Sequence, residues 1–162
     1  MKNSITLAAL LTVLPLAAEA HDGKHNAPTS DHHHITFSAG EPGDASKPAR
    51  VVQVIMSETD GKMLFVPDRL EMKKGDQVRF LLHNRGELDH EFVLAKTAEN
   101  LEHAEEMKKN PDMMHEDPNS RRLGPKRTGE IVWRFTKAGE FEYACLIPGH
   151  REAGMIGTVV VK

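Results

Sequence analysis

The sequence predicts an all-β fold, a β-sandwich with one short helix inserted. Apolar residues fall into short runs that are separated by turn signals about every 8–12 residues, a spacing typical of sandwiches. The 12 glycines and 9 prolines among the 162 residues favour short strands and turns over long helices. We therefore expect roughly seven short strands in one folded domain.

The first half of the folded region begins with four expected strands. Asp60-Gly61 is one of the turn signals that separate them. In the fourth strand, apolar residues alternate from Val78 onward and place His83 on the opposite face, so we interpret His83 as a surface residue. The four strands are expected at residues 51–56, 63–66, 70–73 and 77–83.

His90 lies where the next loop meets a strand expected at residues 92–94. A side chain at such a junction can be directed at a site, although a single histidine there is more often an ordinary surface residue. Residues 98–109 then interrupt the β pattern and predict a helix. Thr97 can cap its N-terminus, and the first helix breaker after it is Pro111.

Three further strands are expected after the helix, at residues 131–136, 141–145 and 156–161. The turn signal at residues 137–140 predicts a hairpin between the first two of them. Side chains alternate with a period of two along a strand, so Cys145 shares a face with Phe141 and Tyr143. Cys145 is therefore expected to point into the core at the end of its strand.

The loop after this strand carries the strongest chemical signal. Residues 145–155 read CLIPGHREAGM, with the only cysteine of the chain, Cys145, then His150 and Met155 at intervals of five. A copper ion that cycles between Cu(I) and Cu(II) needs a thiolate, imidazoles that suit both states, and often a weak axial thioether. The loop supplies one of each. His90 is the candidate for the second imidazole.

Other histidines and methionines lie outside this loop, and two interpretations of them stay open. On the predicted helix, His103 and Met107 are four residues apart and share a face. They form either an amphipathic surface helix with gap-filling methionines or part of a second Cu(I) site. The N-terminal histidines are either a solvated leader or a weak additional copper site. The residues concerned are His103, Met107, Met113, Met114 and His115, and His21, His25, His32, His33 and His34.

The N-terminal region precedes the folded domain. Residues 1–20 contain Lys2, a short apolar stretch and the small-residue cleavage site Ala18-Glu19-Ala20, which together predict a secretory signal peptide. Residues 21–49 are polar and rich in histidine, and we expect a flexible, disordered tail. The β domain is expected at residues 50–162.

The folded region resembles the cupredoxins, the family of type 1 copper proteins. The resemblance rests on the Cys-x4-His-x4-Met loop, whose spacing is similar to that of auracyanins, and on the upstream "DHEFVLA" and "GEFEYACLIPGH" segments. The resemblance covers roughly residues 50–162. This region is similar to periplasmic cupredoxins associated with copper tolerance. The resemblance implies a Greek-key sandwich with a mononuclear copper site at one end.

By position, the resemblance implies that copper is bound by His90, Cys145, His150 and Met155. The thiolate and two imidazoles would bind in a plane, and the thioether would be the weak axial ligand. The chain departs from the family pattern at Glu91, where many cupredoxins have asparagine or serine. Contacts of this kind behind the ligands tune a metal site, so a greener spectrum than the usual blue one is an alternative.

Three classes of function compete. The first is copper tolerance and homeostasis in the periplasm, by sequestration or by oxidation of Cu(I). The second is a soluble electron carrier, in which His150 would be the exposed edge for electron transfer and Arg151 would help to dock a redox partner protein. The third, a cysteine hydrolase using Cys145 and His150, lacks an identifiable base and oxyanion donors. The extra histidines and methionines favour the first.

The composition restricts the partners further. The formal net charge is −3 and no basic run is present, which argues against nucleic acid as a partner. We expect a monomer in the periplasm that binds copper, has no membrane anchor once its signal peptide is cleaved, and is not a hydrolytic enzyme.

Overall fold

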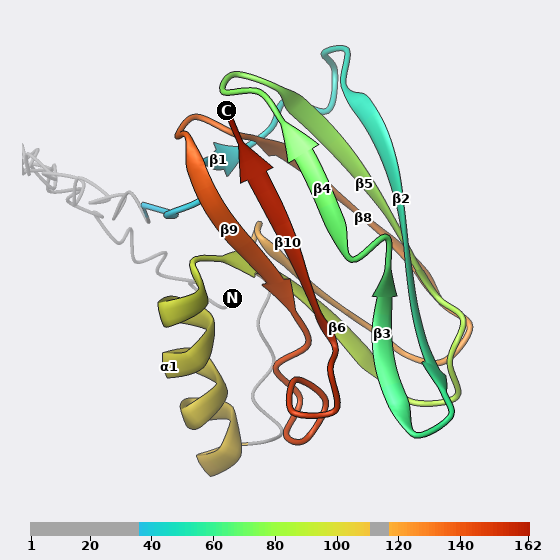
Figure 1. The fold of residues 1–162 in the computed structure, drawn as a ribbon. Coiled ribbons are helices and arrows are strands. Elements are labelled where there is room, and N and C mark those ends of the chain that lie inside the picture. The colour runs from blue at the N-terminus through green and yellow to red at the C-terminus, as the bar shows by residue number, and fades with distance from the viewer. Residues whose placement is uncertain (1–35, 111–116) are drawn as a thin grey trace, which may run out of the picture. The chain divides into compact units, whose positions relative to one another are not determined.

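The computed structural model describes residues 36–110 and 117–162 of the chain. Two five-stranded sheets face each other in this part, which confirms the predicted all-β sandwich with one helix (Figure 1). In chain order, the elements are β1 (Glu41–Pro42), β2 (Arg50–Thr59), β3 (Lys62–Val66), β4 (Arg69–Met72), β5 (Gln77–Asn84), β6 (His90–Ala95), α1 (Thr97–Lys109), β7 (Ser120–Leu123), β8 (Thr128–Arg134), β9 (Gly139–Ala144) and β10 (Ile156–Val161). The strand order is β1-β8-β5-β2-β3 in one sheet and β4-β10-β9-β6-β7 in the other.

The turn at residues 137–140 does not form the hairpin that the sequence predicts. β8 belongs to the first sheet and β9 to the second, so the chain crosses between the sheets here. β8 instead pairs with β5, where Trp133 lies opposite Val78 and Ile131 opposite Phe80. These apolar cross-strand pairs stabilise the observed pairing.

β7 is a strand that the sequence did not predict, because residues 118–129 are polar and turn-rich. Arg121 and Arg122 occupy the centre of β7, so its sequence shows no alternation of apolar and polar residues. The residues at its two ends are buried. It forms by pairing with the edge of β6, where Leu123 lies opposite His90. β7 therefore covers the strand that carries the candidate ligand.

The folded part of the chain begins before residue 50. Residues 36–49, which the sequence assigns to the flexible tail, include β1 on the edge of β8. Ala39 is fully buried, and its carbonyl oxygen accepts a hydrogen bond from Trp133 Nε1 at 3.2 Å. This segment satisfies the indole N–H of a buried tryptophan, a contact that the local sequence pattern does not reveal.

The core between the sheets is built on aromatic side chains. The ring of Tyr143 stacks on Phe92 with centroids 5.2 Å apart and meets the edge of Phe65 at the same distance. Its hydroxyl donates a hydrogen bond to the Pro67 carbonyl at 2.6 Å. These three contacts fix the position of the Tyr143 ring. Tyr143 lies two residues before Cys145, and both side chains point into the core, as predicted.

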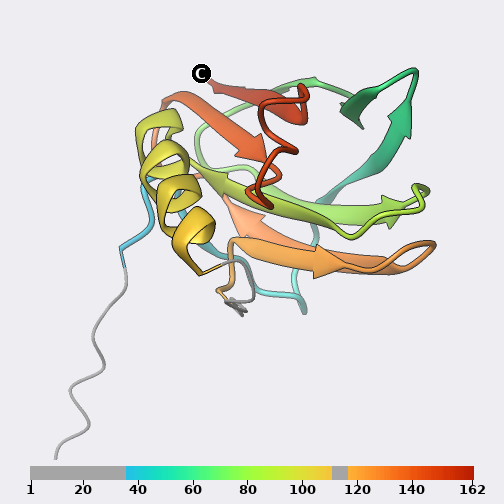
Figure 2. The same cartoon turned by 90° about the horizontal axis from the view of Figure 1, so that it is seen from below.

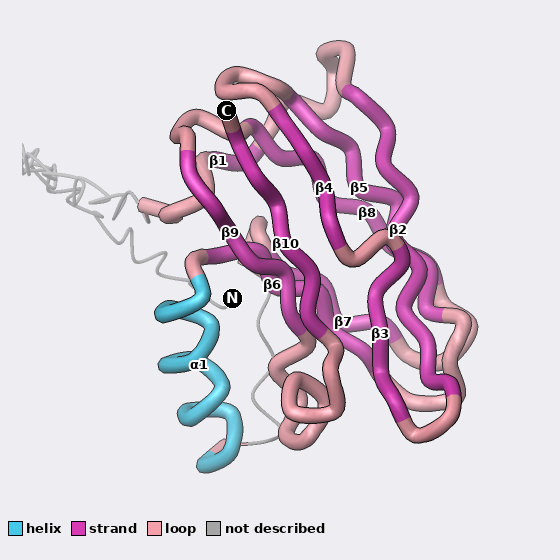
Figure 3. The backbone as a smooth tube through the Cα atoms, in the orientation of Figure 1, coloured by secondary structure: helices cyan, strands magenta, loops and turns pink. Residues whose placement is uncertain are grey.

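The helix α1 packs on the outer face of the second sheet, beside β9 (Figure 3). Its buried residues Ala104 and Met107 join a small apolar cluster with Val93, Ala144 and Leu146. β9 is therefore covered on both faces at the point where it leads into the cysteine loop. In the described ranges, no helix has the length and apolar character needed to cross a membrane.

Candidate metal centre

The cysteine loop closes on itself and on the neighbouring strands at one end of the sandwich (Figures 1 and 2). The Cys145 N–H donates to the Met155 carbonyl, and the Met155 N–H donates to the His150 carbonyl, both at 3.1 Å. The loop also contacts the other sheet, because the Met63 N–H donates to the Ala153 carbonyl at 3.2 Å. These bonds hold the loop against the end of the β2–β3 hairpin.

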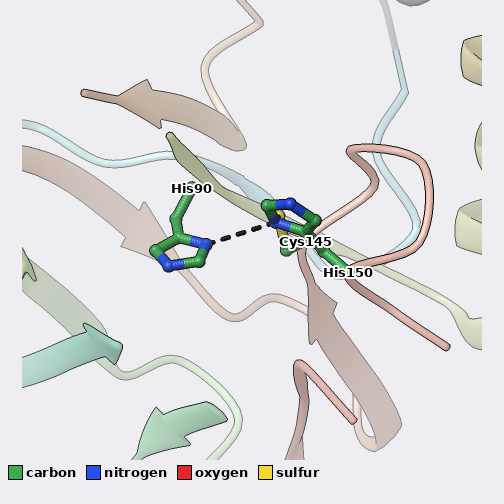
Figure 4. Close-up of side chains that lie close together, drawn as sticks. All are labelled: His90, Cys145 and His150. Carbon is green, nitrogen blue, oxygen red and sulfur yellow. Dashed lines mark hydrogen bonds between the residues drawn. The ribbon is translucent and has the colours of Figure 1, made fainter. Parts of the chain in front are cut away.

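Three of the four predicted ligands converge at this end (Figure 4). The Nδ1 atoms of His90 and His150 are 3.3 Å apart, and Cys145 Sγ is also 3.3 Å from His150 Nδ1. His90 and Cys145 have no exposed surface, whereas His150 is partly exposed. Met155, the fourth, is fully buried in the same core cluster as Cys145.

The Cys145 thiol is fully buried and contacts the backbone of Glu91. Burial raises its pKa to about 12, although the backbone N–H groups of Glu91 and Ile147 partly oppose this effect. The Glu91 N–H donates to Sγ at 3.3 Å. The free thiol is therefore protonated at neutral pH, and a metal that binds the thiolate displaces a proton. Burial also lowers the pKa of His150, with the nearby His90 adding to the shift, which favours the neutral imidazole that metals bind.

Glu91, the position where the chain departs from the family pattern, is buried at the start of β6 and is only 2% exposed. Its backbone contacts the cysteine sulfur directly, and its position in the β6–β7 pairing is opposite Arg122. The negative charge of Glu91 contributes to the raised pKa of Cys145. This residue therefore acts on the sulfur both through its backbone and through its charge.

Glu58 also contacts the site, although the sequence does not identify it as a site residue. It lies near the end of β2, in the opposite sheet, and its Oε1 is 2.8 Å from His90 Nε2. The sequence around it carries no signal that separates it from the other acidic residues of the chain. Only the packing of the β2 end against the loop before β6 brings the two side chains together.

A polar network ties the cysteine loop to β9 and α1. Arg151, next to the ligand His150, forms a two-pronged ion pair with Glu142, with N–O distances of 2.9 and 3.3 Å. Asn100 of α1 donates to the same carboxylate at 3.1 Å. The side chain of Glu142 is 7% exposed and that of Arg151 is 18% exposed. The helix and the loop thus share one buried carboxylate.

We expect Arg151→Met to lower the free energy of unfolding by about 2 kcal/mol, because Glu142 is left buried without its cation. Asn100 still donates to Glu142, which keeps the loss below the usual range for a buried pair. The measurement is urea unfolding of the apoprotein. The control is Lys108→Met, which removes the same charge from exposed pairs with Glu105 and Glu152 and should have a much smaller effect. Equal effects of the two substitutions would contradict the role of the network.

The additional predicted ligands are placed only in part. Met107 is buried among the apolar residues of the α1 cluster, a position consistent with packing, and His103 is partly exposed one turn before it. The other residues named as additional ligands lie outside the described residues: His21, His25, His32, His33, His34, Met113, Met114 and His115.

Comparison with known families identifies the class of protein. Residues 52–162 match the model of the copper binding proteins of the plastocyanin/azurin family. The match spans more than half of the chain, so the protein belongs to this family, the cupredoxins, and copper is its metal. The donor set fits this ion, because a thiolate and two imidazoles converge in a buried site.

Individual relatives agree with this assignment. The chain is 47% identical, over all of both chains, to the copper-resistant cuproprotein CopI of Rubrivivax gelatinosus. It is 35% identical to the protein of the same name from Pseudomonas aeruginosa, over 76% of this chain and 82% of that one. The solved structure of auracyanin B superposes with a TM-score of 0.61 at 22% identity, covering 78% of this chain and 96% of that chain, and supports the fold.

Proposed function

We propose that the protein is a periplasmic copper-binding cupredoxin that acts in copper tolerance, with His90, Cys145, His150 and Met155 as its copper ligands. The observation that carries this proposal is the convergence of Cys145 Sγ and the Nδ1 atoms of His90 and His150 within one buried site. The similarity to two proteins named copper-resistant cuproproteins supports the physiological role. The predicted signal peptide at residues 1–20 supports export to the periplasm.

The chain's own residues account for how such a site would work. Bound copper supplies a one-electron Cu(I)/Cu(II) couple. Cys145 would lose its proton and provide the thiolate, with His150 Nδ1 3.3 Å from its sulfur and His90 Nδ1 3.3 Å from His150 Nδ1. The backbone bonds between Cys145, His150 and Met155 would hold these residues in place in both oxidation states of a bound copper ion. Two activities of this site would serve copper tolerance. One is sequestration of copper, and the other is oxidation of Cu(I) with transfer of its electron to a redox partner protein.

A strain that lacks this protein is expected to stop growing at copper concentrations that the parent tolerates, and to grow normally at low copper. Growth across a copper series measures the effect. Complementation with the wild-type chain should restore tolerance, and complementation with Cys145→Ser should not. Unchanged tolerance in the deletion strain would refute the proposed role without refuting copper binding, which metal analysis of the purified protein tests separately.

A second candidate function is electron transfer between partner proteins. It is favoured by the exposure of His150, since the other two converging ligands are fully buried and only this imidazole reaches the surface. Loss of respiratory or photosynthetic electron flow at normal copper levels in the deletion strain would support it. A hydrolase is disfavoured, because the Cys145 thiol is fully buried and its pKa is raised to about 12.

A further inference from the structure

The partly exposed carboxylate of Glu58, near the end of β2, contacts three hydrogen-bond donors. His90 Nε2 lies 2.8 Å from Oε1, and the Leu88 N–H donates to the same oxygen at 3.0 Å. The Glu87 N–H donates to Oε2 at 3.1 Å. Two of these donors belong to the loop that leads into β6, and the third belongs to the first ligand. Glu58 therefore joins the first sheet to the strand and loop that carry His90.

The loop is shaped to approach this carboxylate closely. Gly86 is buried against Glu58, and a Cβ atom at this position would overlap both carboxylate oxygens. The backbone N–H groups of Leu88 and Glu87 both donate to this carboxylate, which is the arrangement that a carboxylate favours.

The contact between Glu58 and His90 determines which ring nitrogen of His90 is available to bind a metal ion. A carboxylate accepts hydrogen bonds, so the His90 Nε2 that faces Glu58 must carry a proton. In the neutral ring Nδ1 then has a free lone pair, and this atom lies 3.3 Å from His150 Nδ1, on the side where the ligands converge. A hydrogen bond from the far nitrogen to a carboxylate also makes the ligating nitrogen a stronger electron donor.

We propose that Glu58 is a positioning residue that fixes the orientation and tautomer of His90 and makes the site favour Cu(II) relative to Cu(I). The inference rests on the proposed copper site, because it assigns His90 Nδ1 as a ligand. A more electron-rich imidazole stabilises the more positive ion more strongly, so the charge on Glu58 raises the affinity for Cu(II) more than that for Cu(I). The side chain acts through His90, since its oxygens are occupied by the three donors.

The test compares Glu58→Gln with Glu87→Gln. Both remove one negative charge, but the exposed Glu87 side chain pairs with Lys126 and only its backbone contacts Glu58. We expect Glu58→Gln to lower the ratio of Cu(II) to Cu(I) affinity about tenfold, because loss of such a contact typically lowers metal affinity by about 10- to 100-fold and the loss should fall mainly on Cu(II). This corresponds to a rise of about 59 mV in reduction potential for a one-electron couple. Glu87→Gln should leave the potential near that of the wild type.

A second measurement uses the apoprotein and keeps the proposal testable if the variant folds poorly. Nitrogen-15 NMR of the wild-type imidazoles should show His90 as the tautomer protonated at Nε2. A potential that does not move in Glu58→Gln, equal shifts in both variants, or a His90 protonated at Nδ1 would overturn the role of Glu58 and leave the copper site standing. A wild-type protein without thiolate-to-copper absorption would overturn the copper site and this inference together.

Discussion

Replacing Cys145 with serine is expected to abolish the intense thiolate-to-copper absorption of the copper-loaded protein while the domain stays folded. The chain has one cysteine, so no other thiolate can take its place. A serine hydroxyl is nearly the same size, and it can accept the hydrogen bond that the Glu91 N–H now donates to Sγ. The stability cost should therefore be about 1–2 kcal/mol, that of burying a hydroxyl with one partner. Visible absorption after copper loading, with circular dichroism of the apoprotein, measures both effects.

Met155→Leu is the matched control for this substitution. Leucine fills a similar volume in the core, and a weak axial ligand is not needed for the thiolate-to-copper bond. We expect this variant to keep the intense absorption with a shifted maximum. If the serine variant retained the absorption, Cys145 could not be its source, and the assignment of the site would be wrong.

The parts of the site that follow from local pattern were predictable from the sequence. Side chains alternate along β9, so the inward direction of Cys145 follows from Phe141 and Tyr143. The spacing from Cys145 to His150 lies within one loop that a few backbone bonds close. His90 lies 60 positions before His150, and its place where a loop meets a strand made it a candidate only in combination with the cysteine loop.

The parts that depend on contacts between distant segments could not be predicted. Glu58 contacts His90 because the end of β2 lies beside the loop before β6. The residues next to Glu58 in the sequence do not indicate this contact. Ser38 accepts a hydrogen bond from the Lys96 N–H at the start of α1, where the sequence suggested Thr97 as the cap. The network of Glu142 with Arg151 and Asn100 likewise joins three elements. Residue type and spacing do not encode such pairings.

Gly157→Ala is expected to lower the free energy of unfolding by about 3 kcal/mol, at the upper end of the usual range for overpacking. Gly157 lies directly opposite Tyr143 in the β9–β10 pairing, and a Cβ atom there would overlap the tyrosine ring. The ring cannot move aside easily, because it stacks on Phe92, meets the edge of Phe65 and donates its hydroxyl proton to Pro67. Urea unfolding of the apoprotein measures the loss.

Two further variants show whether the ring is the cause of this loss. Gly124→Ala adds the same methyl group where its nearest neighbour, Asp89 Oδ1, is 3.6 Å away, and it should change stability by no more than about 0.5 kcal/mol. In a Tyr143→Leu background the ring is absent, so Gly157→Ala should cost at least about 1 kcal/mol less than in the wild type. An equal cost in both backgrounds would mean that Tyr143 does not require glycine opposite it. Contacts other than the one with Tyr143 would then fix the position of β9, the strand that leads into Cys145.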